Sequence, residues 1–169
     1  TFTYQWQTRD QQTLELRAFD LNSKKENVLL TESSNTWVNL HNDLYFLKDK
    51  GQFIWASERD GFKHLYLFDN KGKLVKQLTK GDWVVDSVEA IDTANNRLYF
   101  SGRKDTPLES HVYSVPLDGG EISRITELGA YHSAAFSKDA SIFIDRFSTI
   151  NSPAQVSLNS ATGERITWL

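Results

Sequence analysis

Short apolar runs separated by polar turn segments recur along this chain, and within them the pattern has the two-residue period of β-strands. Residues 65–68 alternate Leu with Tyr and Phe, and short runs of β-branched and aromatic residues occupy positions 53–55, 98–100 and 142–144. No window of about 11 residues carries the apolar stripe of an amphipathic helix. The pattern therefore predicts an all-β protein.

Turn-forming residues separate these runs. Segment 69–72 reads Asp-Asn-Lys-Gly and segment 118–120 reads Asp-Gly-Gly. Glycine and asparagine adopt positive φ at low cost, so such segments favour tight hairpins between antiparallel strands.

The chain also repeats itself, with a period of about 45 residues. An aliphatic residue followed by threonine recurs at Leu30-Thr31, Leu78-Thr79, Ile125-Thr126 and Ile166-Thr167. The tripeptide that begins at His64 has a counterpart at His111, again with a tyrosine two positions later. Each repeat reads as about four strands, which is typical of the blades of a β-propeller.

We therefore predict antiparallel four-stranded blades of a partial β-propeller, about four blades within a single domain, 1–169. The predicted blades span residues 1–42, 43–82, 83–130 and 131–169, and the first lacks its first strand. The alternative is a single β-sandwich in which the repeats arise by chance. Open blade edges leave backbone groups unpaired, so self-association of the chain is a further expectation.

Composition narrows the range of functions. The chain has 169 residues, of which 24% are charged and 39% hydrophobic, and its net charge is −3. This charge argues against nucleic acid or an anionic membrane as the main partner. No apolar run of about 18 residues is present, so no membrane span is expected. Since the chain does not begin with Met and its first residues already read as a strand, we expect both ends to be cut from a longer protein.

The candidate catalytic chemistry is sparse. The chain has no cysteine and no G-x-S-x-G motif, and its histidines lack the spacing of metal ligands, so we expect no catalytic residue, metal or cofactor here. His64 and His111 occupy the same place in two repeats, which favours a structural role over ligation or catalysis. Residues 58–61 read as a charged hairpin, with an active site made of a carboxylate pair and a guanidinium as the alternative. The five tryptophans are expected to fill wedges between blades, with ligand stacking as the alternative.

The segment from Trp37 to Asn42 is the most informative connection. It follows a predicted strand end and combines aromatic, amide and imidazole side chains. In a propeller, such a connection runs from the outer edge of one blade to the next inner strand, where it can face the central channel. A functional rim and simple linker packing both remain open at this point.

Two longer stretches carry a resemblance to a known family. Thr-Trp-Val-Asn-Leu-His-Asn-Asp at 36–43 and Phe-Ile-Trp-Ala-Ser-Glu-Arg-Asp-Gly-Phe-Lys-His-Leu-Tyr at 53–66 resemble bacterial dipeptidyl peptidase IV. Weaker similarity continues at 105–113 and 131–137 and in the spacing to Pro153, so that it covers nearly the whole chain.

The resemblance implies a serine peptidase with an N-terminal eight-bladed propeller followed by an α/β-hydrolase domain that carries Ser, Asp and His. Such enzymes release N-terminal dipeptides with Pro or Ala in second position. This chain corresponds to the second half of the propeller and lacks the hydrolase domain and the paired glutamates that bind the substrate amine. By resemblance, Leu40 and His41 border the extended substrate pocket.

The function expected is thus a non-catalytic propeller that encloses and gates the active site. Its implied partners are the hydrolase domain of the same parent chain and a peptide substrate, and its implied location is periplasmic or secreted. The alternative is a protein-interaction propeller of the WD40 or TolB type without enzymatic activity. The repeats lack the G-H…W-D signature of WD40 proteins, which disfavours the WD40 type but not the TolB type.

Overall fold

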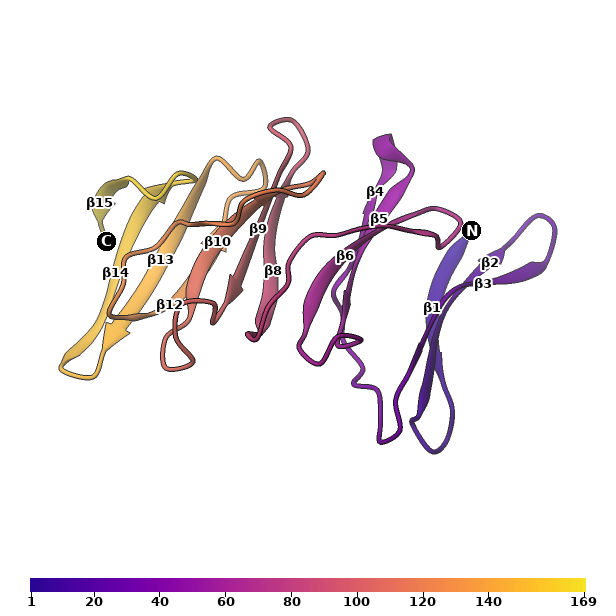
Figure 1. The fold of residues 1–169 in the computed structure, drawn as a ribbon. Coiled ribbons are helices and arrows are strands. Elements are labelled where there is room, and N and C mark those ends of the chain that lie inside the picture. Colours follow the sequence, from indigo (N-terminus) through magenta and orange to yellow (C-terminus); the bar gives the residue numbers. More distant parts are fainter. The chain divides into compact units, whose positions relative to one another are not determined.

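The computed structural model describes residues 1–169, whose strands form four separate antiparallel sheets (Figure 1). The first sheet contains β1 (Phe2–Gln7), β2 (Thr13–Asp20) and β3 (Lys25–Ser33). The second contains β4 (Leu44–Leu47), β5 (Gln52–Ser57), β6 (His64–Asp69) and β7 (Leu74–Gln77), with the 3-10 turn η1 (Lys48–Lys50) between its first two strands. The third contains β8 (Val85–Asp92), β9 (Arg97–Gly102), β10 (His111–Pro116) and β11 (Ser123–Arg124). The fourth contains β12 (Tyr131–Phe136), β13 (Ile142–Thr149), β14 (Ser152–Ser160) and β15 (Arg165–Trp168).

Within every sheet, the strands lie side by side in the order in which they occur along the chain. The first sheet has three strands and the other three have four. This meander of short hairpins repeated along the chain confirms the predicted all-β class and the blades of a partial propeller, and it does not match a single β-sandwich. No helix in the structure has the length and apolar character needed to cross a membrane.

The chain divides into two compact units, which are described separately. Unit 1 contains residues 1–61 and 65–77, and unit 2 contains residues 62–64 and 78–169. Unit 1 thus holds the first two sheets, apart from the first residue of β6, and unit 2 holds the last two.

The core of unit 1 forms where its two sheets face one another. Leu14, Leu16 and Leu30 of the first sheet pack with buried aromatic side chains of the second, among them Trp55 and Phe68. Trp55 is fully buried, so the prediction that tryptophans fill the wedges between blades is confirmed there. Trp6, Trp37 and Trp168 are 39%, 56% and 51% exposed, and for these three the expectation stays a prediction. Trp6 lies opposite Glu15, on the face of the sheet that turns away from this core, and Trp37 lies in a loop.

Two buried histidines, His64 and His111, hold corresponding places in unit 2. Each contacts a threonine that follows the last strand of its sheet. The Nδ1 atom of His64 lies 3.0 Å from Oγ1 of Thr79, and that of His111 lies 3.1 Å from Oγ1 of Thr126. Nε2 of His64 lies 2.8 Å from the carbonyl of Gly81, which can only accept, so both ring nitrogens of His64 have hydrogen-bond partners. The two repeated sequence motifs are therefore partners in one repeated contact, and the structural role predicted for these histidines is confirmed.

The second ring nitrogen distinguishes the two histidines. Nε2 of His111 contacts a carboxylate oxygen of Glu109 at 2.8 Å, where His64 uses a backbone carbonyl. The hydrogen bond from His111, together with one from the backbone N–H of Gly129, lowers the pKa of Glu109 below its ordinary value. The contact thus stabilises the ionised form of this half-buried carboxylate.

Aspartates occupy the start of several hairpin turns and accept backbone N–H groups there. The backbone N–H of Ser23 lowers the pKa of Asp20 to about 2, assisted by the hydroxyls of Ser23 and Thr1. The backbone N–H of Lys73 likewise lowers the pKa of Asp69, and the hydroxyls of Ser137 and Ser141, followed by the backbone N–H of Ser141, lower that of Asp139. Each turn therefore depends on an ionised carboxylate.

We predict that Thr79→Val destabilises the chain by about 1–3 kcal/mol, because Nδ1 of the buried His64 loses its hydroxyl partner while the shape of the side chain is kept. The measurement is urea unfolding followed by tryptophan fluorescence. Thr31→Val is the matched control, since Thr31 belongs to the same sequence motif but is exposed. Equal unfolding midpoints for the two variants would contradict a stabilising role for the contact.

A second prediction concerns how the stability of the folded chain changes at acidic pH. Because the pKa of Asp20 is lower in the folded chain than its ordinary value of 3.8, its contribution to stability is complete above that value and is lost as the pH falls toward 2. Asp20→Asn keeps an acceptor oxygen but does not titrate. The free energy of unfolding of the variant should therefore fall less steeply than that of the parent chain between about pH 4 and pH 2. Parallel stability–pH curves over this interval would show that the turn does not depend on the charge of Asp20.

Candidate functional site

The connection between β3 and β4 contains both residues that the sequence assigned to a substrate rim. We call residues 34–43 the rim segment. Its backbone is tied to the β1–β2 hairpin, because Ser34 N–H donates to the carbonyl of Gln12 at 3.0 Å and Val38 N–H to that of Gln11 at 2.8 Å. The segment is therefore a loop that follows the edge of the first sheet before it enters the second.

Leu40 and His41 are placed differently, although they are neighbours in the chain. The side chain of Leu40 is 62% exposed. His41 is half-buried, and its ring lies over Trp55 with 4.3 Å between the ring centroids. Nδ1 of His41 accepts the backbone N–H of Asp43 at 3.2 Å. In this geometry, Leu40 offers an apolar contact at the surface, while His41 joins the rim segment to the core beneath it.

A buried carboxylate supports the tryptophan under His41. Oε1 of Glu32 accepts a hydrogen bond from the indole N–H of Trp55 at 3.1 Å and pairs with the guanidinium of Arg59 at 2.5 Å. Arg59 also donates from Nε to the hydroxyl of Ser57 at 2.9 Å and lies over the ring of Tyr66. Since the charge of Glu32 is paired and hydrogen-bonded, it can remain in a buried position.

This network shows which contacts the charged side chains of the hairpin at residues 58–61 make. Arg59 is directed at Glu32, and Glu58 accepts a hydrogen bond from the amide of Asn39 at 2.9 Å. Gly61 has a φ of 101°, which suits glycine at this turn. The hairpin interpretation is thus confirmed, and the hairpin also holds the rim segment through Asn39.

Sequence reasoning did not identify Glu32, although a signal was present. Glu32 is two residues beyond the buried Leu30 on β3, so it lies on the same face of that strand. A carboxylate on an otherwise apolar face is costly without a partner, and it could have been matched with a nearby arginine.

The exposed part of the rim segment combines apolar and polar groups. Trp37 is 56% exposed, and its indole N–H donates to Oδ1 of Asn39 at 3.2 Å. With Leu40, it provides an apolar surface beside the amide of Asn39 and the carboxylate of Glu58. Such a surface is suited to contacts with a peptide, since apolar and amide groups meet both kinds of peptide surface.

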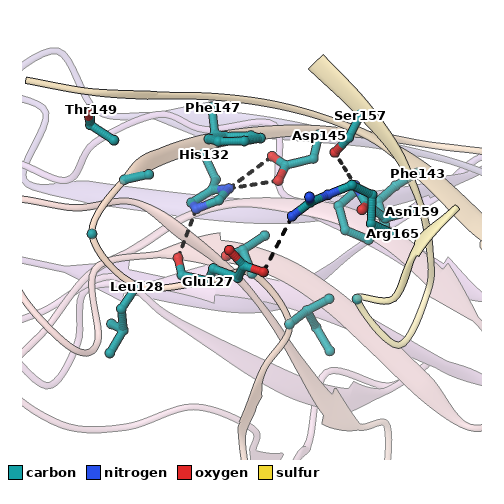
Figure 2. Close-up of a pocket in the computed structure, with 15 residues that line it drawn as sticks. Glu127, Leu128, His132, Phe143, Asp145, Phe147, Thr149, Ser157, Asn159 and Arg165 are labelled. Carbon is teal, nitrogen blue, oxygen red and sulfur yellow. Dashed lines mark hydrogen bonds and ion pairs between the residues drawn. The ribbon is translucent and has the colours of Figure 1, made fainter. Parts of the chain in front are cut away.

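A cavity of about 180 Å³ lies in unit 2, bordered by the fourth sheet and by the segment that precedes it (Figure 2). His132 and Asp145 reach into it from β12 and β13, with 2.8 Å between Nδ1 and Oδ2. Nε2 of His132 donates to the carbonyl of Glu127 at 2.9 Å, and Arg165 pairs with the side chain of Glu127 at the same cavity. Neither the spacing nor the motifs of the chain indicate this pair, because its members come together only through the pairing of β12 with β13.

The pair of His132 and Asp145 has two members of a hydrolytic triad but not its geometry. In a triad, the imidazole nitrogen opposite the carboxylate takes a proton from a nucleophilic hydroxyl. Here that nitrogen is bound to a backbone carbonyl, which can only accept. Both ring nitrogens of His132 therefore face acceptors, and the arrangement joins two segments of unit 2 without forming a nucleophile.

Comparison with a family model places the chain among known proteins. Residues 1–154 match the family described as "Dipeptidyl peptidase IV (DPP IV) N-terminal region". The match includes the rim segment, the hairpin at 58–61 and the cavity residues of the fourth sheet up to Thr149.

Two curated relatives and one solved structure that resemble this chain are also named as dipeptidyl peptidases or dipeptidyl-aminopeptidases. Dipeptidyl peptidase 8 of Homo sapiens is 31% identical over 163 residues, with 78% of this chain and 18% of the relative covered. A Probable dipeptidyl-aminopeptidase B of Emericella nidulans is 29% identical over 178 residues, with 95% and 19% covered. The crystal structure of Porphyromonas gingivalis dipeptidyl peptidase 4 has a TM-score of 0.88 at 24% identity and matches 99% of this chain to 24% of its own length, which shows the fold. The chain therefore spans less than a fifth of these curated relatives, and it belongs to the dipeptidyl peptidase IV N-terminal region family.

Proposed function

We propose that this chain is the non-catalytic propeller portion of a serine-type dipeptidyl peptidase. In this proposal, a hydrolase domain in the same parent chain carries Ser, Asp and His and releases N-terminal dipeptides with Pro or Ala in second position. The observation that carries the proposal is the family match over residues 1–154, with relatives that are named as dipeptidyl peptidases.

The structure supports a binding role for the rim segment within that enzyme. Leu40 and Trp37 expose apolar surface, and both are held by residues that are themselves anchored, Val38 to the β1–β2 hairpin and Asn39 to Glu58. A preorganised surface contributes to binding because little conformational entropy is lost when the ligand arrives. The propeller would enclose and gate the site and add contacts with the substrate, while bond cleavage takes place on the hydrolase domain.

The direct test is the activity of the full-length parent protein. It should hydrolyse Gly-Pro-p-nitroanilide with a kcat/KM at least about a hundredfold above that for Gly-Gly-p-nitroanilide, because selection for proline is a property of the proposed reaction. An inactive parent protein, or one that does not distinguish the two substrates, would refute the proposal and favour the alternative of an interaction propeller.

Leu40 provides a test of the rim itself. In the parent protein, Leu40→Asp should raise KM on the order of fivefold for peptides that extend several residues beyond the cleaved bond, with little change for Gly-Pro-p-nitroanilide. Leu21→Asp is the matched control, since both leucines are 62% exposed and Leu21 lies in the turn between β2 and β3. If both variants behave alike, Leu40 has no specific role in substrate binding.

An exposed sheet face supports the proposal of self-association for the isolated chain. Ile142 and Ile144 of β13 are 36% and 42% exposed, and Tyr131 of β12 is 48% exposed, so unit 2 presents apolar surface on the side of the fourth sheet opposite His132. In the parent protein, we propose that further propeller sequence covers this face.

Light scattering of the isolated chain should therefore show association that increases with concentration. Ile144→Lys should shift the chain toward monomer, whereas Ile150→Lys should not, because Ile150 is 99% exposed in the loop after β13 and is not part of the sheet face. A chain that stays monomeric at high concentration would contradict association through this surface.

A further inference from the structure

We propose that Gln5 and Gln7 are positioning residues, which hold the rim segment so that Leu40 has a defined place beside the substrate. The inference rests on the proposed function, because it concerns the same rim. It adds residues from a distant part of the chain that nothing in the sequence connected with the site.

Both glutamines lie on the face of β1 that is directed at the core of unit 1. In the register of the first sheet, Gln5 lies opposite Leu16 and Gln7 opposite Leu14, and both leucines are fully buried. Directly opposite residues of an antiparallel pair project to the same face. Two amides therefore occupy positions at which the alternation of the strand would favour apolar side chains.

Each of these amides holds one end of the central part of the rim segment. Nε2 of Gln7 donates to the carbonyl of Val38 at 2.7 Å, and Nε2 of Gln5 donates to the carbonyl of His41 at 2.8 Å. Asn39 and Leu40 are the residues between these two points. The position of the Leu40 backbone is consequently set from both sides by β1.

The remaining polar atom of Gln5 indicates that this residue is not optimised for stability. Its Oε1 is buried and has no hydrogen-bond partner in the structure. A buried acceptor without a partner is unfavourable, and an apolar side chain of similar volume would avoid that penalty. The glutamine is therefore better explained by its donor, which reaches the carbonyl of His41, than by packing.

The register of the contacts agrees with this explanation. The two glutamines are separated by one residue on an extended strand, and the carbonyls that they hold are separated by two residues in the rim segment. The other side chain of this stretch of β1, Trp6, lies on the opposite face with Arg17 over its ring. The amides thus act on one side of the strand, as a pair.

The test uses the full-length parent protein with Gln5→Leu, Gln7→Leu and the double variant. Leucine keeps the approximate volume and removes the donor. We expect hydrogen exchange of the backbone amides of residues 38–44 to become faster, and KM for peptides extended beyond the cleaved bond to rise on the order of fivefold in the double variant, with kcat and the hydrolysis of Gly-Pro-p-nitroanilide unchanged. Gln155→Leu, in an exposed position of β14, is the control and should change neither readout.

The outcomes separate the two proposals. If the unmodified parent protein does not hydrolyse Gly-Pro-p-nitroanilide, the proposed function fails. If the parent protein is active but the double variant shows unchanged exchange and unchanged KM, the positioning role fails while the proposed function stands. A fall in kcat for both substrates together with a lower Tm would identify the glutamines as structural residues and would also overturn the positioning role.

Discussion

A four-stranded sheet has no second layer of its own, and this constraint governs how the chain folds. Each sheet is stable only when another surface covers its apolar face, since an isolated meander of short strands buries too little to offset the entropy of folding. In unit 1, the leucines of the first sheet and the aromatic residues of the second supply this cover for one another, with Trp55 fully buried between them. In unit 2, Tyr99 of the third sheet and Phe136 of the fourth make a similar contact, with 4.8 Å between ring centroids.

Apart from Oε1 of Gln5, the buried side-chain polar atoms have hydrogen-bond partners, and these partners differ between the units. Unit 2 repeats one solution, in which a buried histidine bonds the threonine near the end of the following strand. Unit 1 uses a different one, in which the carboxylate of Glu32 joins Trp55 to Arg59. Because a buried polar group that loses its partner is strongly destabilising, these contacts restrict which residues can occur at each position.

The candidate site follows from the same architecture. Connections between sheets lie at the surface and tolerate more sequence variation than the strands. They can therefore contain binding residues, provided that a rigid framework holds them in place. The rim segment is such a connection. Gln5 and Gln7 hold its backbone from one sheet, and Glu58 holds Asn39 from the other. The role proposed for Leu40 depends on this support, because an apolar side chain on an unrestrained loop would lose much of its binding energy to ordering.

The fold class could be inferred without a structure, because strand periodicity, turn residues and the repeated motifs are local properties of the sequence. The pairing of His64 with Thr79 follows the repeat and could also have been anticipated. The contacts of the candidate site could not be inferred from the sequence, since Gln5, Glu32 and Trp55 are far apart in it. The alternation pattern shows only which face of a strand each residue occupies, and not which residues it contacts there. Only the packing of one sheet on another brought the two glutamines to the rim segment, seated His41 on Trp55 and left Leu40 exposed, because such contacts depend on the register and twist of whole sheets.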